Sequence, residues 1–303
     1  MLYERILVPL DGSELAQVAL PYARELGGRM GSWITLMYVS ESADDRYNDM
    51  HRQYMQDMVE ATVQGAEKYV DKAGGRDVRV DAVIAVGNPA EQIVDYAESQ
   101  NMGLIVMTTH GRSGVKRWAL GSVADKVVRA TRRPVALIRA KRVEAEVGTR
   151  GVFDRILVSL DGSRESEAVL PYVQELASRT GAEVALVQVV APDYHIYGAG
   201  GPEYGTYADQ QMESIKAYAK AYLEEIASGL KRAGMATRCI VSVGTAADEI
   251  IRLADEICAD MVAMSTHGRS GVGRWALGSV AERVVRSGNT PVLLVRTPGA
   301  ATE

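Results

Sequence analysis

The sequence predicts an α/β fold of two tandem Rossmann-like domains, each a five-stranded, parallel, doubly wound sheet with helices on both faces. Two observations support this prediction. Short apolar segments alternate with segments of helical periodicity, and most of the first half of the chain recurs in the second half. A length of 303 residues leaves each half long enough to bury a core of its own.

The repeat aligns at two offsets. RILV at 5–8 returns at 155–158, an offset of 150, whereas THGRSGV at 109–115 returns at 266–272, an offset of 157. The second half therefore holds about seven extra residues, and we place them in the Gly- and Tyr-rich segment 193–204. That segment is expected to be a surface loop, and the stretch 194–207 is a candidate lid over a ligand.

The first half begins with an expected strand at 6–10 and a helix at 13–27. Pro21 lies inside that helix and predicts a kink or an interruption, because proline removes a backbone donor and clashes with the preceding turn. The remaining strands are expected at 33–39, 78–86, 104–107 and 134–138, and the remaining helices at 45–73, 91–99 and 122–129. Strands this apolar are typical of a sheet buried on both faces.

The second half repeats this order, including a proline at Pro171. Its strands are expected at 156–160, 184–190, 237–243, 261–264 and 291–295. The charged segment 140–151 ends in glycines and suits a linker, so we set the domains at 1–147 and 148–303.

Composition indicates an ordinary globular protein. Hydrophobic residues make up 47% and charged residues 24%, and the net charge of −5 gives no general attraction to nucleic acid or to an anionic membrane. The sequence shows neither a membrane-length apolar run nor a signal peptide, and we expect a cytoplasmic protein. Cys239 and Cys258 lack metal-ligand spacing and are expected to be free thiols.

A glycine-punctuated turn enters a helix in each half, through Gly121-Ser122 and through Gly278-Ser279. Such turns present backbone N–H groups to phosphate. In a doubly wound sheet, ligands bind at the carboxyl ends of the strands where the chain reverses direction. Asp11 would then face this turn across a crevice, where its carboxylate could accept ribose hydroxyls or hold Mg²⁺ through water.

Structural alternatives remain open for these residues. Ser122 with Asp125, and Ser279 with Glu282, could each form a capping box that occupies the same N–H groups, and Asp11 could instead cap its own helix. For His110 and His267, a loop-orienting hydrogen bond is favoured over acid–base chemistry. The turns also carry cations that could neutralise phosphate or be solvated, and tryptophans expected to be packing anchors: Arg112, Arg117, Arg269, Arg274, Trp118 and Trp275.

These residues resemble the universal stress protein family in its tandem, two-domain form, over nearly the whole chain. Nucleotide-binding members of that family show Gly-x2-Gly-x9-Gly-Ser/Thr after the fourth strand, and this chain matches the second part of the pattern in both halves. The resemblance implies binding of an adenine nucleotide. The implied contacts are Pro9, Asp11, Val39, Met107, Gly111, Gly121, Ser122 and Val123 in the first half, and Asp161, Val189, Met264, Gly268, Gly278, Ser279 and Val280 in the second.

The match departs from the family pattern at three positions. Thr108 and Ser265 stand where the pattern has its first glycine, and their side chains could crowd the site or give a hydroxyl to the ligand. Ser159 stands at the position of Pro9. In the family, the last strands pair across a two-fold axis, which implies an internal pseudo-dimer here and leaves a homodimer open.

The resulting hypothesis is a cytoplasmic, ATP-binding protein with a regulatory or stress-response role, with Mg²⁺ as a candidate companion of the nucleotide. Slow ATP hydrolysis is conceivable, yet no residue is an obvious general base. The alternative is a family member that binds no nucleotide and acts through protein–protein contacts. An enzyme of the ATP pyrophosphatase type would need a Ser-Gly-Gly-x-Asp-Ser loop, which the LDGS sequence at 10–13 does not supply.

Overall fold

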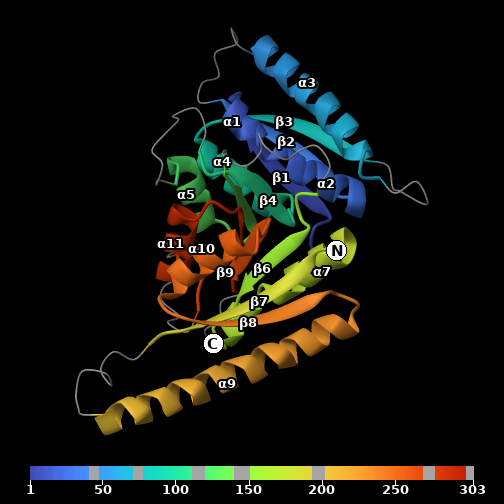
Figure 1. Ribbon diagram of the computed structural model, residues 1–303. Coiled ribbons are helices and arrows are strands. Elements are labelled where there is room, and N and C mark those ends of the chain that lie inside the picture. Colours follow the sequence, from blue (N-terminus) through green and yellow to red (C-terminus); the bar gives the residue numbers. More distant parts are fainter. Residues whose placement is uncertain are drawn as a thin grey trace, which may run out of the picture.

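The computed structural model describes residues 1–40, 48–70, 78–110, 120–139, 151–192, 202–268 and 277–297. Within them, ten strands form one sheet in the order β3-β2-β1-β4-β5-β10-β9-β6-β7-β8 (Figure 1). The first half contributes β1 (Arg5–Leu10), β2 (Trp33–Ser40), β3 (Arg79–Val86), β4 (Leu104–Thr108) and β5 (Val135–Ile138). The second contributes β6 (Arg155–Ser159), β7 (Glu183–Val190), β8 (Thr237–Val243), β9 (Met261–Ser265) and β10 (Val292–Val295).

Helices cover both faces of this sheet. One layer holds α1 (Glu14–Gln17), α2 (Leu20–Met30), α3 (Asn48–Glu67), α6 (Arg164–Glu167), α7 (Leu170–Thr180) and α9 (Pro202–Arg232). The other holds α4 (Pro89–Ser99), α5 (Ser122–Ala130), α10 (Ala246–Glu256) and α11 (Ser279–Ser287). Each face buries one apolar cluster that draws on both halves of the chain. The strands therefore have the double-sided burial that their apolar sequences predict.

The prolines interrupt the first helix of each half, as predicted. The expected helix at 13–27 is divided into α1 and α2, and Pro21 lies in the first turn of α2, where no intrahelical donor is needed. Pro171 takes the same place in α7. The Ser13 side chain caps α1 by accepting from the Ala16 N–H at 3.2 Å.

The strand order places a reversal of chain direction at the centre of each half. In the first half, β1 pairs in parallel with β2 on one side and with β4 on the other, so Ile6 lies opposite both Ile34 and Leu104. In the second half, β6 lies between β7 and β9 in the same way. The carboxyl ends of β1 and β4 are therefore neighbours, which is the position where this architecture binds ligands.

The last strands of the two halves join the domains. β5 and β10 pair antiparallel, with Ala136 opposite Leu293, so the expected edges are buried at the centre of the ten-stranded sheet. This pairing agrees with the predicted internal pseudo-dimer.

Two carboxylates at equivalent positions of the two halves, Glu25 and Glu175, accept backbone hydrogen bonds across the domain junction. The Val152 N–H donates to Glu25 at 2.7 Å, and the Leu2 N–H donates to both oxygens of Glu175 at 3.0 and 2.9 Å. Glu25 is fully buried, and that burial raises the pKa of its carboxyl. Each half therefore accepts a backbone donor from the other.

The prediction of a loop at 193–204 is wrong from Pro202 onward, because α9 begins there. Residues 193–201 lie outside the described residues, and so does the predicted domain boundary at 147/148. α9 buries Ala219, Leu223, Ala227 and Leu230 at helical spacing against β7 and β8. Its first turns project past the sheet in Figure 1. Among the described residues, no helix has the length and apolarity to cross a bilayer.

Candidate functional site

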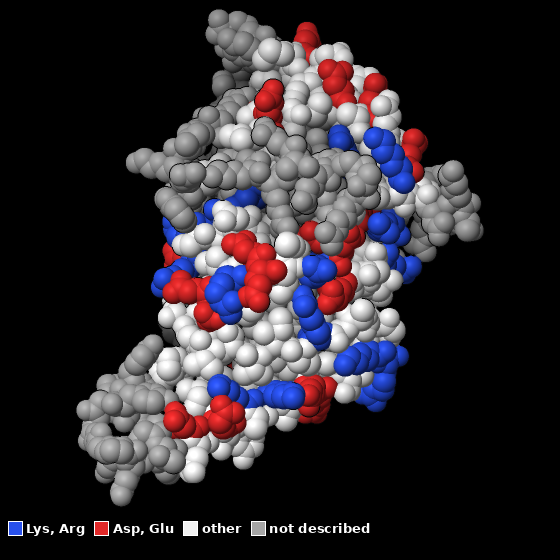
Figure 2. All heavy atoms as spheres, in the orientation of Figure 1, with Lys and Arg blue, Asp and Glu red and all other residues white. Residues whose placement is uncertain are grey.

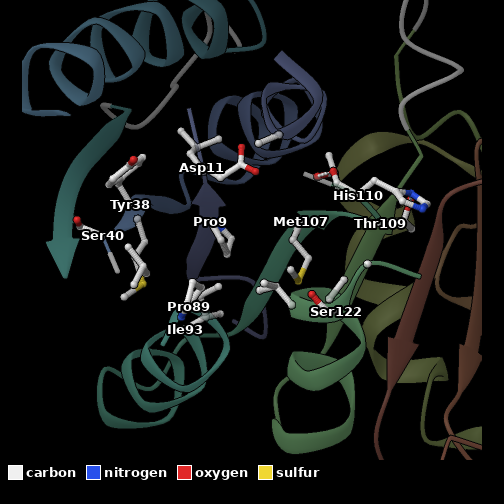
Figure 3. Close-up of a pocket in the computed structure, with 18 of the residues that line it drawn as sticks. Pro9, Asp11, Tyr38, Ser40, Pro89, Ile93, Met107, Thr109, His110 and Ser122 are labelled. Atoms are coloured by element: carbon white, nitrogen blue, oxygen red, sulfur yellow. Dashed lines mark hydrogen bonds between the residues drawn. The ribbon is translucent and has the colours of Figure 1, made fainter. Parts of the chain in front are cut away.

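A cavity of about 630 Å³ lies at the carboxyl ends of β1, β2 and β4, and we call it the first crevice. Figure 3 shows Asp11 and Ser122 on opposite sides of it, with Pro9 and Met107 between them. The sequence-predicted residues that line it are Pro9, Asp11, Val39, Met107, Gly121, Ser122 and Val123. Gly111 lies outside the described residues, as do the arginines and tryptophans of both turns.

The first turn of α5 faces this crevice without a side-chain cap. Gly121 is the N-cap residue in extended conformation and has no side chain with which to cap the helix. Asp125 instead accepts from Arg129 at 3.0 Å. The capping-box alternative is therefore wrong for both halves, because α11 likewise begins at Gly278 without a side-chain cap and Glu282 bonds Arg286 at 3.0 Å.

The motif glycines allow a close approach of two backbone segments. The Gly121 N–H donates to the Thr109 carbonyl at 2.7 Å, and a Cβ at Gly121 would lie 2.9 Å from the same oxygen. Gly278 repeats both contacts with Thr266, at 2.8 and 2.9 Å. The N–H of Gly121 thus closes the turn, and the donors presented to the crevice come from the residues after it.

Asp11 is oriented by the residue that caps the next helix. Its Oδ1 accepts from the Ser13 N–H at 3.0 Å and from the Ser13 hydroxyl at 2.6 Å. Asp161 makes the same pair of contacts with Ser163, at 2.9 and 2.5 Å. The alternative in which Asp11 itself caps α1 is wrong, and both carboxylates are held at a crevice wall.

The hydroxyls that replace the first motif glycine are used inside the turn. Thr108 donates to the His110 carbonyl at 2.8 Å, and Ser265 donates to the His267 carbonyl. Thr109 bonds His110 Nδ1 at 3.1 Å, and Thr266 bonds His267 Nδ1 at 3.0 Å. The extra side chains therefore order the turn, and the histidines have the loop-orienting hydrogen bond that the sequence favoured.

Several lining residues escaped the sequence analysis. Tyr38 Oη and His51 Nε2 lie 3.0 Å apart, with ring centroids separated by 4.4 Å, and they close the end of the crevice beside α3. Tyr38 was accessible to prediction because it pairs with Leu10 near the end of a strand beside β1. His51 was not, because only tertiary packing brings α3 to the crevice. The others are Leu10, Ala16, Met37, Ser40, Met50, Pro89, Ile93 and Ala124, whereas Thr108, Thr109 and His110 line the crevice in the motif that the sequence singled out.

The second crevice repeats the arrangement with a cavity of about 260 Å³. Ser166 stands where the first half has Ala16, and Gln188 stands at the position of Tyr38 without lining the cavity. The turn also lies against the aspartate, since a Cβ at Gly268 would be 2.2 Å from Asp161 Oδ2. The predicted residues that line this crevice are Asp161, Val189, Met264, Gly268, Gly278, Ser279 and Val280.

The charges on the surface match the near-neutral composition. In Figure 2, acidic and basic side chains of the described residues are interspersed over the visible face rather than gathered into one basic field. Among the described residues, no group of three or more His, Cys, Asp and Glu side chains is arranged to hold a metal ion. A cation in either crevice would therefore need ligand oxygens or water in addition to the aspartate.

Comparison with known proteins gives one consistent assignment. The model of the universal stress protein family matches residues 2–139 and again 153–296. A universal stress protein of Mycolicibacterium smegmatis is 25% identical, over 96% of each chain, and the universal stress protein MJ0531 of Methanocaldococcus jannaschii is 26% identical over 47% of this chain and 86% of its own. The crystal structure of a universal stress protein from Archaeoglobus fulgidus covers 99% of both chains with a TM-score of 0.68 at 21% identity. The chain belongs to the universal stress protein family, with two copies of the family domain in tandem.

Proposed function

We propose that this protein binds ATP in the first crevice and acts as a regulatory, stress-response module. The observation that carries the proposal is the uncapped first turn of α5 facing Asp11 across a cavity of about 630 Å³. That volume falls within the range of about 300–1,000 Å³ that small-molecule sites occupy. A helix N-terminus favours phosphate through both its free donors and its dipole.

The lining divides the crevice into regions of different chemistry. Ser122 and Val123 present backbone donors to the phosphates, and Asp11 accepts from the ribose hydroxyls or holds Mg²⁺ through water. The other end is apolar and aromatic, with Val39 and Tyr38 against the base and its opposite face closed by residues of α4. This order from phosphate to base fits a nucleotide lying along the strand ends.

The second crevice supports nucleotide binding less well. Its cavity of about 260 Å³ is below the usual size of a nucleotide site, and Ser166 and Gln188 stand in place of Ala16 and of the aromatic Tyr38. This difference favours one tight site in each chain. The small second cavity is also compatible with the alternative that the second half acts through protein–protein contacts alone.

Hydrolysis is not part of the proposal. The Nδ1 atom of His110 is engaged by the neighbouring threonine, which suits a residue that orients the turn more than a general base. We therefore assign contacts to nucleotide and no catalytic residue.

Isothermal titration of the full chain with ATP and Mg²⁺ tests the proposal. We expect saturable heat with one strong site in each chain, and about 10-fold weaker binding at that site in Asp11→Ala. Asp161→Ala is the matched control, because it removes the equivalent carboxylate from the smaller crevice. Absence of heat at millimolar nucleotide would reject ATP binding, and the same titration repeated with EDTA shows whether Mg²⁺ contributes.

A further inference from the structure

Two arginines, one in each half of the chain, each donate hydrogen bonds to a helix of the other half. Arg139 follows β5 in the first half and donates to the Val285 carbonyl near the end of α11. Arg296 follows β10 in the second half, and its Nη1 donates to the carbonyls of Arg129 at 3.3 Å and Thr131 at 3.0 Å, at the end of α5. The last carbonyls of a helix have no partner within the helix, so each arginine supplies a missing donor from the other domain.

Each arginine also adjoins the turn of its own crevice. The residue before Arg139 is Ile138, whose carbonyl accepts from the Thr109 N–H at 2.9 Å. The residue before Arg296 is Val295, whose carbonyl accepts from the Thr266 N–H at 2.9 Å. Thr109 and Thr266 are the residues whose carbonyls bind the motif glycines. A continuous chain of contacts therefore runs from the turn of one crevice to the far end of the helix that opens on the other.

The helices between these contacts are short. α5 and α11 have nine residues each, a length of about 13 Å. A shift at the carboxyl end of such a helix moves its first turn as well, and the first turn is the part that faces the crevice. A cation at a helix carboxyl terminus is also electrostatically favourable.

The two helices are aligned by a shared group of charges. Arg129 approaches Glu282 at 3.5 Å, and Arg286 approaches Asp125 at 3.7 Å, while each arginine also pairs within its own helix. These side chains are partly exposed, so we assign them an aligning role and little stability. Arg139 and Arg296 are more enclosed, and burial lowers the pKa of both guanidinium groups.

We propose that Arg139 and Arg296 are positioning residues that couple the two crevices. Arg296 fixes the position of the first turn of α5 in the first crevice, and Arg139 fixes the position of the first turn of α11 in the second. An anion bound at one turn restricts the motion of that turn and its helix. The adjoining arginine contact then restricts the motion of the helix that it contacts in the other half. The two crevices then bind anions with positive cooperativity. This inference rests on the proposed nucleotide binding.

The test measures the first crevice alone, in the full chain carrying Asp161→Ala. Adding Arg296→Met keeps the length of the side chain and removes its donors. We expect the affinity for ATP to fall about 5- to 10-fold, the lower part of the usual range for coupled sites, although Arg296 does not line the first crevice. Arg283→Met is the matched control, because Arg283 pairs with Asp248 at 2.7 Å within its own half. We expect this control to change the affinity less than 2-fold.

The reciprocal experiment uses Asp11→Ala, which weakens the first crevice, and compares binding at the second crevice with and without Arg139→Met. We expect a similar loss of affinity for ATP there, or for inorganic pyrophosphate if the smaller cavity excludes the nucleoside. Arg296→Lys retains the cation without the planar fork and should recover part of the loss at the first crevice.

A second readout separates this inference from the proposed function. Without any ligand, Arg296→Met should speed hydrogen exchange several-fold at the Asp125 amide, which donates to the Gly121 carbonyl at 2.9 Å, while the amides of β1 and β4 keep their protection. Unchanged exchange and unchanged affinity in a folded Arg296→Met chain would overturn the coupling. Faster exchange without any ATP binding in the parent chain would instead reject the proposed function and leave the mechanical link standing.

Discussion

The two crevices share a motif but not a volume. Both turns close through a glycine N–H on a threonine carbonyl, and both aspartates are held by a serine two residues on. The first cavity is nevertheless about 630 Å³ and the second about 260 Å³. The motif thus determines where an anion can bind. Residues outside the motif determine how large a ligand fits beside it.

The largest expected effect is at the motif glycine. In Gly121→Val, the new Cβ would lie 2.9 Å from the Thr109 carbonyl, so the turn must move away from α5. Loss of two charge-assisted hydrogen bonds to phosphate should weaken ATP binding about 100-fold or more, measured by isothermal titration. Gly278→Val places the same clash in the second turn. If both variants weaken the strong site equally, the two crevices are not different in the way proposed.

The aspartates should give the next largest difference. Asp11→Ala removes an oriented carboxylate from the larger crevice, and we expect about a 10-fold loss of affinity for ATP, as for one hydrogen bond to a charged group. Asp161→Ala should change the strong site less than 2-fold in the same titration. Asp11→Asn keeps an acceptor for Ser13 and should lose less affinity than Asp11→Ala.

Exchanging Tyr38 and its counterpart Gln188 tests whether an aromatic wall accounts for the stronger binding expected in the first crevice. Tyr38→Gln gives the first crevice the residue of the second and removes the ring that contacts His51. We expect about a 5-fold loss of affinity for ATP, the value of roughly one aromatic contact. Gln188→Tyr is the reverse exchange. An unchanged titration of Tyr38→Gln would show that the aromatic wall does not contact the base.

The smallest effect concerns the junction of the halves. Burial raises the pKa of Glu25, so the folded state holds its proton to higher pH than the unfolded state does. The contribution of Glu25 to stability is therefore fully present below its ordinary pKa of 4.5 and is lost as the pH rises through the raised value. Glu25→Gln cannot ionise and still accepts from the Val152 N–H.

We expect the urea midpoint of Glu25→Gln to fall less between pH 4.5 and neutrality than that of the parent. Glu175→Gln is the two-fold counterpart and serves as the control for loss of a carboxylate at the same junction. A parallel pH dependence in parent and Glu25→Gln would contradict the assignment of the raised pKa to Glu25.

The sequence by itself determined the strands to within one or two residues, the interruptions at Pro21 and Pro171, and the position of the glycine turn. These features depend on local hydrogen bonding and on burial periodicity, which are written along the chain. The family resemblance implied the pairing of the last strands, and the structure has it.

Only the tertiary structure decided the rest. Local sequence offered Asp125 as a cap, but Arg129 of the same helix and Arg286 from across the domain junction engage it. His51 reaches the first crevice from α3, and Arg296 reaches α5 from the other domain. Contacts between residues so far apart along the chain leave no periodic trace in the sequence, because they depend on where whole helices settle against the sheet.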